Sequence, residues 1–81
     1  MILLKSNKLN KAEQIIKIAM LTRHIKNVRD LADRMGAESA TIRKNLKDPD
    51  SMSIGRLKSI AEVTGLTNDQ IGEIVRAANL R

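Results

Sequence analysis

The chain has 81 residues, which suffices for one domain with a modest core and leaves little room for a buried active-site cleft. It has no cysteine, which excludes disulfides and thiolate metal sites, and no aromatic residue, so aliphatic side chains and methionine must build the core. The formal net charge is +6, no apolar run approaches a membrane span, and the first eight residues are too brief and polar for a signal peptide, so we expect a cytoplasmic protein.

Residues 1–9 contain no helix cap and mix the apolar patch Ile2-Leu3-Leu4 with basic and polar residues. We interpret them as an N-terminal arm, whose patch packs on the core or pairs with a partner chain. Residues 10–81 are expected to form the folded domain.

The first helix is predicted from about Lys11 to about His24. Asn10 is a favourable N-cap, and Glu13, three residues later, makes a variant of the capping box. Two apolar stripes run along this helix, one of Ala12, Ile16, Ala19 and Met20 and one of Ile15, Ile18, Leu21 and Thr22. A helix that is apolar on two faces is expected to be buried on both. It should therefore lie centrally, or beneath the arm or a second subunit.

Two short helices joined at a glycine are predicted next. Asn27 caps the first, which ends at Met35, and Gly36 supplies the left-handed residue that turns the chain. The second runs from about Ser39 to Lys47. Apolar residues with helical spacing lie on both sides of the glycine, at Leu31, Ala32, Met35, Ile42 and Leu46. This layout is typical of a helix-turn-helix, whose second helix enters the major groove of DNA.

Two more helices complete the predicted fold. The segment 48–51 breaks the third helix, because a residue before proline avoids the helical region. Ser53 caps a fourth helix that ends at Gly65, and Thr67 with Gln70 forms a capping box for the fifth. Five short helices without a strand signal predict an all-α domain of the globular kind rather than an up-down bundle.

The positive charge is concentrated near the N-terminus. Residues 1–29 hold seven Lys or Arg against one acid, Glu13, whereas residues 30–81 hold eight of each sign. Uneven positive charge on a small domain suggests a polyanionic partner. The alternative is that a small basic protein is simply soluble.

Three motifs carry a family resemblance: L-A-x-x-x-G-x-x-x-x-T-I at residues 31–42, S-I-x-x-L-x-x-I-A at 53–61 and G-L-T at 65–67. Together they resemble the lambdoid phage repressor and Cro family of helix-turn-helix regulators over residues 27–68. The resemblance implies a lambda-repressor-like fold and a transcriptional regulator, of the Cro or repressor kind, that binds double-stranded DNA sequence-specifically. Regulators of this type usually bind as two-fold dimers.

The chain departs from the family pattern at three positions and in the loop 47–52, which is not the short glycine-containing loop usually seen. Val28 stands where a glutamine often holds a phosphate, Glu38 replaces the usual Ser or Thr cap, and Asn45 occupies a place that is often apolar. Glu38 is expected to cap less well and to repel a nearby phosphate. These departures bear on the DNA contacts more than on the fold.

The resemblance also implies the base-facing positions, which are Ser39, Ala40, Arg43 and Lys44. Arginine or lysine can donate to guanine, serine can serve several bases, and an alanine methyl can touch thymine. The alternative is that Arg43 and Lys44 touch only phosphates or form a solvated face. Phosphate contacts are expected from two helix N-termini and nearby cations, at Asn27, Arg29, Lys47, Ser53 and Arg56.

The fifth helix is the expected dimer element, because its apolar stripe exceeds what a small core requires. The stripe residues assigned to the interface are Ile71, Ile74 and Val75. Gly72 inside this helix could let a partner helix come close. Equally, the stripe could pack only on the first helix.

No enzyme, cofactor or metal site is expected. His24 is the only histidine, and we interpret it as the residue that terminates the first helix. We interpret the paired carboxylates as helix-capping and turn residues. A second class of function is an antitoxin, which binds a toxin partner through an apolar surface and represses its own promoter. Single-stranded RNA binding is disfavoured, because base stacking usually needs aromatic side chains.

Overall fold

The computed structural model describes residues 10–78, and the predicted arm at 1–9 and tail at 79–81 lie outside this range. The elements in chain order are α1 (Lys11–Thr22), α2 (Val28–Met35), α3 (Ser39–Lys47), the 3-10 turn η2 (Pro49–Ser51), α4 (Ile54–Thr64) and α5 (Asn68–Ala77). The described range contains no strand, and the all-α prediction is confirmed. None of its helices combines the length and apolar character needed to cross a membrane.

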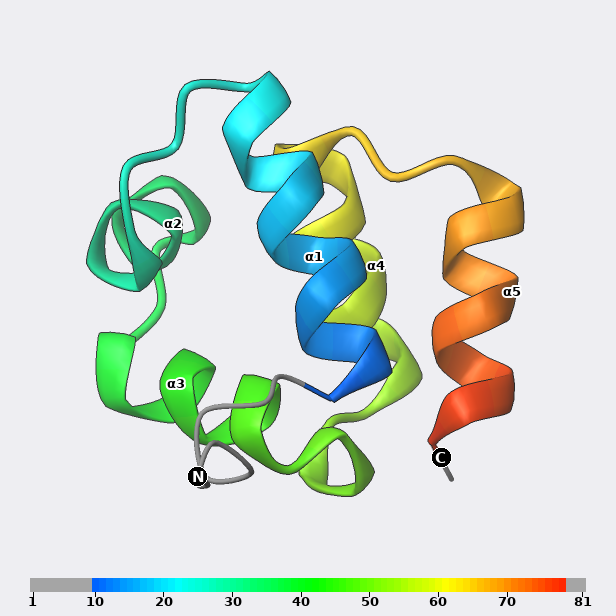
Figure 1. The fold of residues 1–81 in the computed structure, drawn as a ribbon. Coiled ribbons are helices and arrows are strands. Elements are labelled where there is room, and N and C mark those ends of the chain that lie inside the picture. Colours follow the sequence, from blue (N-terminus) through cyan, green and yellow to red (C-terminus); the bar gives the residue numbers. More distant parts are fainter. Residues whose placement is uncertain (1–9, 79–81) are drawn as a thin grey trace, which may run out of the picture.

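α1 is the central element of the fold. It packs against α3, α4 and α5, and α2 packs on α3 and α4 (Figure 1). The space between these helices is filled by aliphatic side chains and methionine, as the absence of aromatic residues requires. The largest completely buried apolar side chains are Ile16, Ile25, Leu31, Ile42, Leu46, Met52, Leu57, Ile60 and Ile74.

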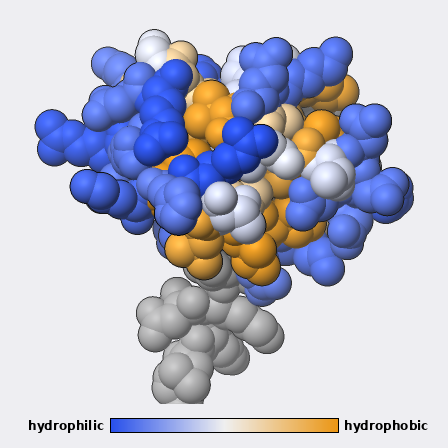
Figure 2. All heavy atoms as spheres, turned by 90° about the horizontal axis from the view of Figure 1, so that it is seen from above, coloured by the Kyte–Doolittle hydropathy of each residue, from blue (hydrophilic) through white to orange (hydrophobic). Residues whose placement is uncertain are grey.

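Only one of the two apolar stripes on α1 lies in the core. Its members Ala12, Ile16, Ala19 and Met20 are buried. On the other stripe, Ile18 is 60% exposed and Leu21 is 73% exposed, so residues 10–78 do not bury this second face, and its burial beneath the arm or a second subunit stays a prediction. Figure 2 shows apolar surface lying open among hydrophilic side chains.

Side-chain caps begin four of the helices. The cap oxygens accept backbone N–H groups at 2.8–3.1 Å, in the pairs Asn10 with Glu13, Asn27 with Asp30, Ser53 with Arg56 and Thr67 with Gln70. The box at Thr67 closes, since the Gln70 side chain accepts the Thr67 N–H at 2.8 Å. The box at Asn10 does not close, because the Glu13 carboxylate instead binds two lysines.

Left-handed residues end α2 and α4, as predicted. Gly36 has φ 69° and Gly65 has φ 75°, where a Cβ is disfavoured. The N–H of Ala37 then donates to the carbonyl of Ala32 at 2.9 Å, which satisfies a free carbonyl at the end of α2. This tight turn starts α3 next to α2.

α1 is also followed by a left-handed residue, but this residue is not a glycine. It ends at Thr22, before its predicted end, and His24 takes the left-handed conformation with φ 58°. The N–H of Ile25 donates to the carbonyl of Met20 at 2.9 Å, and Ile25 is carried into the core. The sequence predicts that His24 terminates the helix, but it does not predict the left-handed conformation of this residue.

The strain at His24 leads to a stability prediction. The substitution His24→Gly should raise the free energy of unfolding by about 0.5–1 kcal/mol. Glycine has no Cβ to clash in the left-handed conformation, which stabilises the folded state. Part of this stabilisation is offset because glycine has more conformational entropy to lose on folding. Urea denaturation measures it. His24→Ala is the control, since it removes the ring and keeps the Cβ, and it should give no gain. A His24→Gly protein less stable than wild type would contradict the expectation.

Candidate nucleic-acid interface

The inner face of α3 anchors this helix to the rest of the protein. Ile42 and Leu46 are 0% and 1% exposed. Asn45 is also buried, and its Nδ2 donates to the Ser51 hydroxyl at 3.2 Å, which ties α3 to η2. The burial of Asn45 explains why members of the family often have an apolar residue at this position. Because one side of a short helix is fixed in this way, the opposite side must face solvent.

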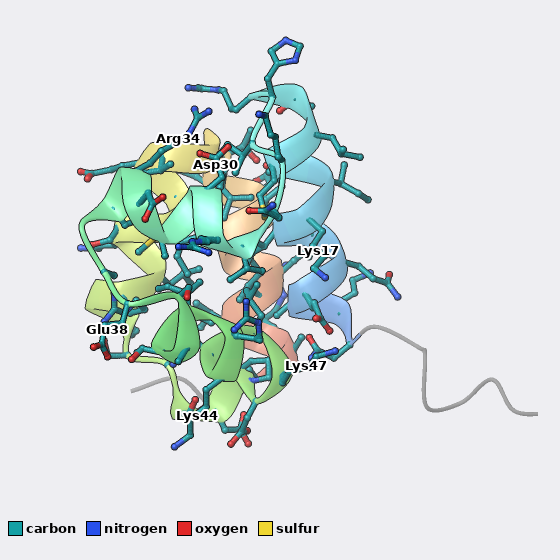
Figure 3. The ribbon with its side chains drawn as sticks, turned by 90° about the vertical axis from the view of Figure 1, so that its left-hand side faces the viewer. Lys17, Asp30, Arg34, Glu38, Lys44 and Lys47 are labelled. Atoms are coloured by element: carbon teal, nitrogen blue, oxygen red, sulfur yellow. The ribbon has the colours of Figure 1, made fainter. Side chains whose placement is uncertain are left out.

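The outer face of α3 is cationic. Ala40, Arg43, Lys44 and Lys47 are exposed, and Ser39 is half-buried at the start of the helix. The helix contains no acidic residue. Figure 3 shows Lys44 projecting away from the body of the protein and Lys47 lying at the end of α3 that faces α1. All four residues predicted to face the bases thus lie on one helix, and three of them are exposed.

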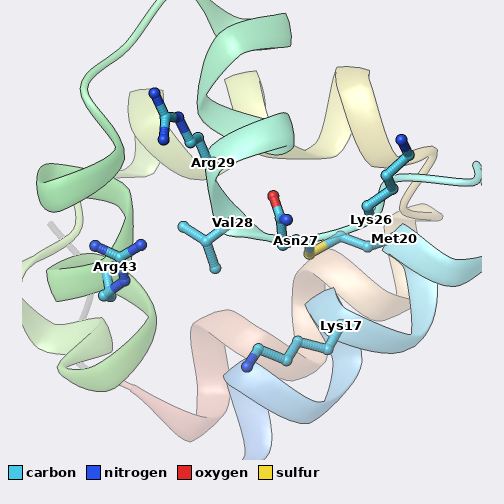
Figure 4. Close-up of a pocket in the computed structure, with 7 residues that line it drawn as sticks. All are labelled: Lys17, Met20, Lys26, Asn27, Val28, Arg29 and Arg43. Carbon is cyan, nitrogen blue, oxygen red and sulfur yellow. The ribbon is translucent and has the colours of Figure 1, made fainter.

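A cleft of about 500 Å³ opens beside the N-terminus of α2. Its lining brings together α1, the loop before α2, the first turn of α2 and α3 (Figure 4). Four of the lining residues are basic and none is acidic; the full set is Lys17, Met20, Lys26, Asn27, Val28, Arg29 and Arg43. The exposed backbone N–H groups at a helix N-terminus add partial positive charge, so the cleft suits an anion.

Two of these cations, Lys17 and Lys26, were not among the residues predicted from the sequence. The only signal that pointed to them was the excess of basic residues in the N-terminal third. That excess does not say which basic side chains face α3, because the packing of α1 on the helix-turn-helix decides it.

Asp30, in the first turn of α2, finds its hydrogen-bond and ion-pair partners within the protein. The Asp30 carboxylate accepts the Lys26 N–H at 3.0 Å and pairs with Arg34 at 3.2 Å. These hydrogen bonds, the backbone one first, lower the pKa of Asp30 below its usual value. Its charge is therefore balanced by Arg34 on the next turn, and the basic groups dominate the neighbouring cleft.

The remaining predicted phosphate contacts lie on two other helix ends. Lys47 is exposed at the last residue of α3, and its Nζ lies 3.6 Å from a Glu13 carboxylate oxygen. Ser53 is the N-cap of α4, and Arg56 in the first turn is half-buried. Gly55 between them has only the Ser53 hydroxyl, at 3.8 Å, near the place of a Cβ, so this helix end is open. Neither Ser53 nor Arg56 lines the cleft.

The predicted dimer residues on α5 differ in their exposure. Ile74 is completely buried, Ile71 is partly buried against the core, and Val75 is 36% exposed. α5 packs on α1, which was the alternative left open, so Ile74 offers no surface to a partner. A Cβ at Gly72 would lie 3.3 Å from the Arg76 guanidinium, so a side chain of the same helix covers this glycine. The dimer contact itself stays a prediction.

No group of three His, Cys, Asp or Glu side chains that could hold a metal ion occurs within residues 10–78.

Among known protein families, a family model described as a Cro/C1-type HTH DNA-binding domain matches residues 16–77. The match includes α2, the turn at Gly36 and α3, together with most of α1, all of α4 and all of α5. The searches of curated proteins and of solved structures gave no significant match.

The start of α3 leads to a second stability prediction. Glu38 occupies the N-cap with φ −80° and ψ 134°, which suits a capping residue, yet its side chain makes no cap hydrogen bond. The substitution Glu38→Ser should raise the free energy of unfolding by about 1 kcal/mol, because a short hydroxyl can accept a free N–H of the first turn. Thermal denaturation followed by circular dichroism measures it.

Glu38→Gln is the matched control for the cap. It removes the same charge without a short acceptor, so it should give much less stabilisation than Glu38→Ser. Equal gains from the two variants would show that the charge, and not the missing cap, limits stability at this position.

Proposed function

The chain belongs to the family of Cro/C1-type helix-turn-helix DNA-binding domains, and we propose that it is a transcriptional regulator that binds a specific double-stranded operator with α3 in the major groove. The strongest support for this proposal is the charge on the exposed side of α3. The side of α3 that the core leaves open bears three cations and no acid. A helix of this kind fits the width of the major groove.

Base reading is assigned to the exposed face of α3. Arg43 and Lys44 have the reach and the donors to bind guanine O6 and N7. Ala40 presents a methyl group that suits thymine, and Ser39 stands at the start of the helix, next to the same groove. The exposure of these side chains supports the assignment, since none of the four is buried.

Phosphate binding is assigned to the surroundings of α3. Asn27 and Arg29 flank the N-terminus of α2, in the cleft that also holds Lys17 and Arg43. With Val28 in place of a polar side chain, the backbone N–H groups of α2 and the neighbouring cations take over that contact. Lys47, whose ammonium lies beside the same Glu13 carboxylate oxygen as that of Lys17, and the start of α4, at Ser53 and Arg56, complete the proposed phosphate contacts.

A repressor that acts as a dimer is the form of regulation we propose. Two copies of α3 about 34 Å apart would read the two halves of a symmetric site and block a promoter in the cytoplasm by occupying it. Of the α5 stripe, Val75 and the exposed part of Ile71 are free for such a contact.

An antitoxin is the second candidate, and a specific observation favours it. Ile18 and Leu21 leave an apolar stripe open on α1, away from the inner face of that helix. Such a stripe suits a protein partner. Co-purification with a small partner protein would favour this candidate, whereas a clean homodimer would favour the Cro-like regulator.

Selection of bound sequences from a random duplex pool tests the proposed function. The expected result is a two-fold symmetric consensus. Recovery of unrelated sequences alone would show that the domain binds duplexes without reading them.

Substitution of Arg43 then tests the reading helix. Arg43→Ala should weaken binding to the selected duplex by about 1–3 kcal/mol and relax the choice of base at one position of each half-site, because a base-donating side chain is lost. Fluorescence anisotropy with matched and mismatched duplexes measures both effects. Lys58→Ala is the control, since it removes one exposed positive charge from α4. If the two variants lose affinity equally for every duplex, Arg43 reads no base.

A further inference from the structure

Glu13 is the only acidic residue among the first 29 residues, and it is buried. Its side chain is 3% exposed, in the first turn of α1. One carboxylate oxygen, Oε2, lies 3.7 Å from the Nζ of Lys17 and 3.6 Å from the Nζ of Lys47. A single buried carboxylate thus holds one lysine from its own helix and one from α3.

The site of this pairing is fixed by the packing of α1 on α3. Asn10 caps α1 through its side-chain oxygen, and its Nδ2 donates to the carbonyl of Leu46 at 2.9 Å near the end of α3. The start of α1 is therefore held against the last turn of α3. This contact keeps the backbone of Glu13 close to Lys47.

Both lysines belong to the proposed DNA surface. Lys17 lines the cleft beside α2, and Lys47 ends the helix assigned to the major groove. Their side chains remain 41% and 67% exposed, so each ammonium lies beside the carboxylate and still reaches solvent. A phosphate that approaches either lysine must share it with Glu13.

We propose that Glu13 is an internal competitor for DNA phosphate, which weakens the hold of Lys17 and Lys47 on any duplex. The proposal rests on the proposed function. A charge held in the protein interior is less screened than one on the surface, so its pull on the two lysines persists in salt. Base reading by Arg43 does not involve this carboxylate, because Arg43 is not among its partners. Glu13 therefore lowers charge-driven binding to all DNA and leaves base reading in place, which raises the share of affinity that depends on sequence.

The test is Glu13→Gln in the full chain, with a duplex of arbitrary sequence as the probe. Glutamine keeps the shape of the side chain and releases both lysines. We expect binding to this duplex to tighten by about three- to tenfold near 100 mM salt, and the slope of log K against log salt to become steeper by up to about 0.9 for each lysine released. Fluorescence anisotropy over a salt series measures both.

Glu62→Gln is the matched control. Glu62 is exposed in the last part of α4, and its loss changes the net charge by the same amount without touching either lysine. It should tighten binding much less than Glu13→Gln. In a Lys17→Gln and Lys47→Gln double variant, Glu13→Gln should give no gain beyond that of Glu62→Gln.

The outcomes separate this proposal from its premise. If wild type binds duplexes and Glu13→Gln matches Glu62→Gln, or binds more weakly than wild type, Glu13 does not compete with phosphate and this proposal alone falls. If wild type binds no duplex, the proposed function falls and this proposal with it. Should Glu13→Gln fail to fold, Glu13→Asp is compared with Glu62→Asp, because the shorter side chain draws the carboxylate back from the two ammonium groups and the net charge is unchanged in both variants; binding no tighter for Glu13→Asp than for Glu62→Asp overturns the proposal.

Discussion

The burial of one side of α3 is the constraint on which the rest of the structure depends. The helix has nine residues, and Ile42 and Leu46 must be removed from water together. Because successive side chains turn by about 100° around a helix, hiding these two positions leaves Arg43 and Lys44 on the outside. Because of the left-handed turn at Gly36, the preceding helix α2 packs on the apolar side of α3 and covers part of it. The chain therefore cannot build its core without presenting a cationic helix to solvent.

The electrostatics around this helix follow from where the acids lie. Asp30 is balanced by Arg34, and the buried Glu13 by Lys17 and Lys47, so both carboxylates are paired with basic groups of the same protein. The cleft beside α2 has a basic lining without an acid. The exposed side of α3 and the cleft beside α2 are therefore positive, although Glu38 is exposed at the start of α3, and the pairing of Lys17 and Lys47 with Glu13 moderates the pull of this surface on phosphate.

Local signals made much of this fold predictable. Asn27 and Gly36 bound α2, and Pro49 stops α3, because caps, left-handed residues and proline act within a few residues of themselves. Features that depend on packing between distant segments were not predictable. The exposure of Ile18 and Leu21 depends on how much of α1 its neighbours cover. The pairing of Glu13 with Lys47, and the place of Lys17 and Lys26 in the cleft, depend on the docking of α1 against α3 and α2. The outward side of α3 was predictable because it is the complement of its apolar side.

Titration of the isotope-labelled protein with its selected duplex, followed by amide chemical shifts, tests most directly whether α3 meets the DNA. We expect the largest changes at residues 39–47 and at residues 27–29, in α3 and at the start of α2. Changes confined to α5 and the end of α4, with α3 unaffected, would contradict this expectation.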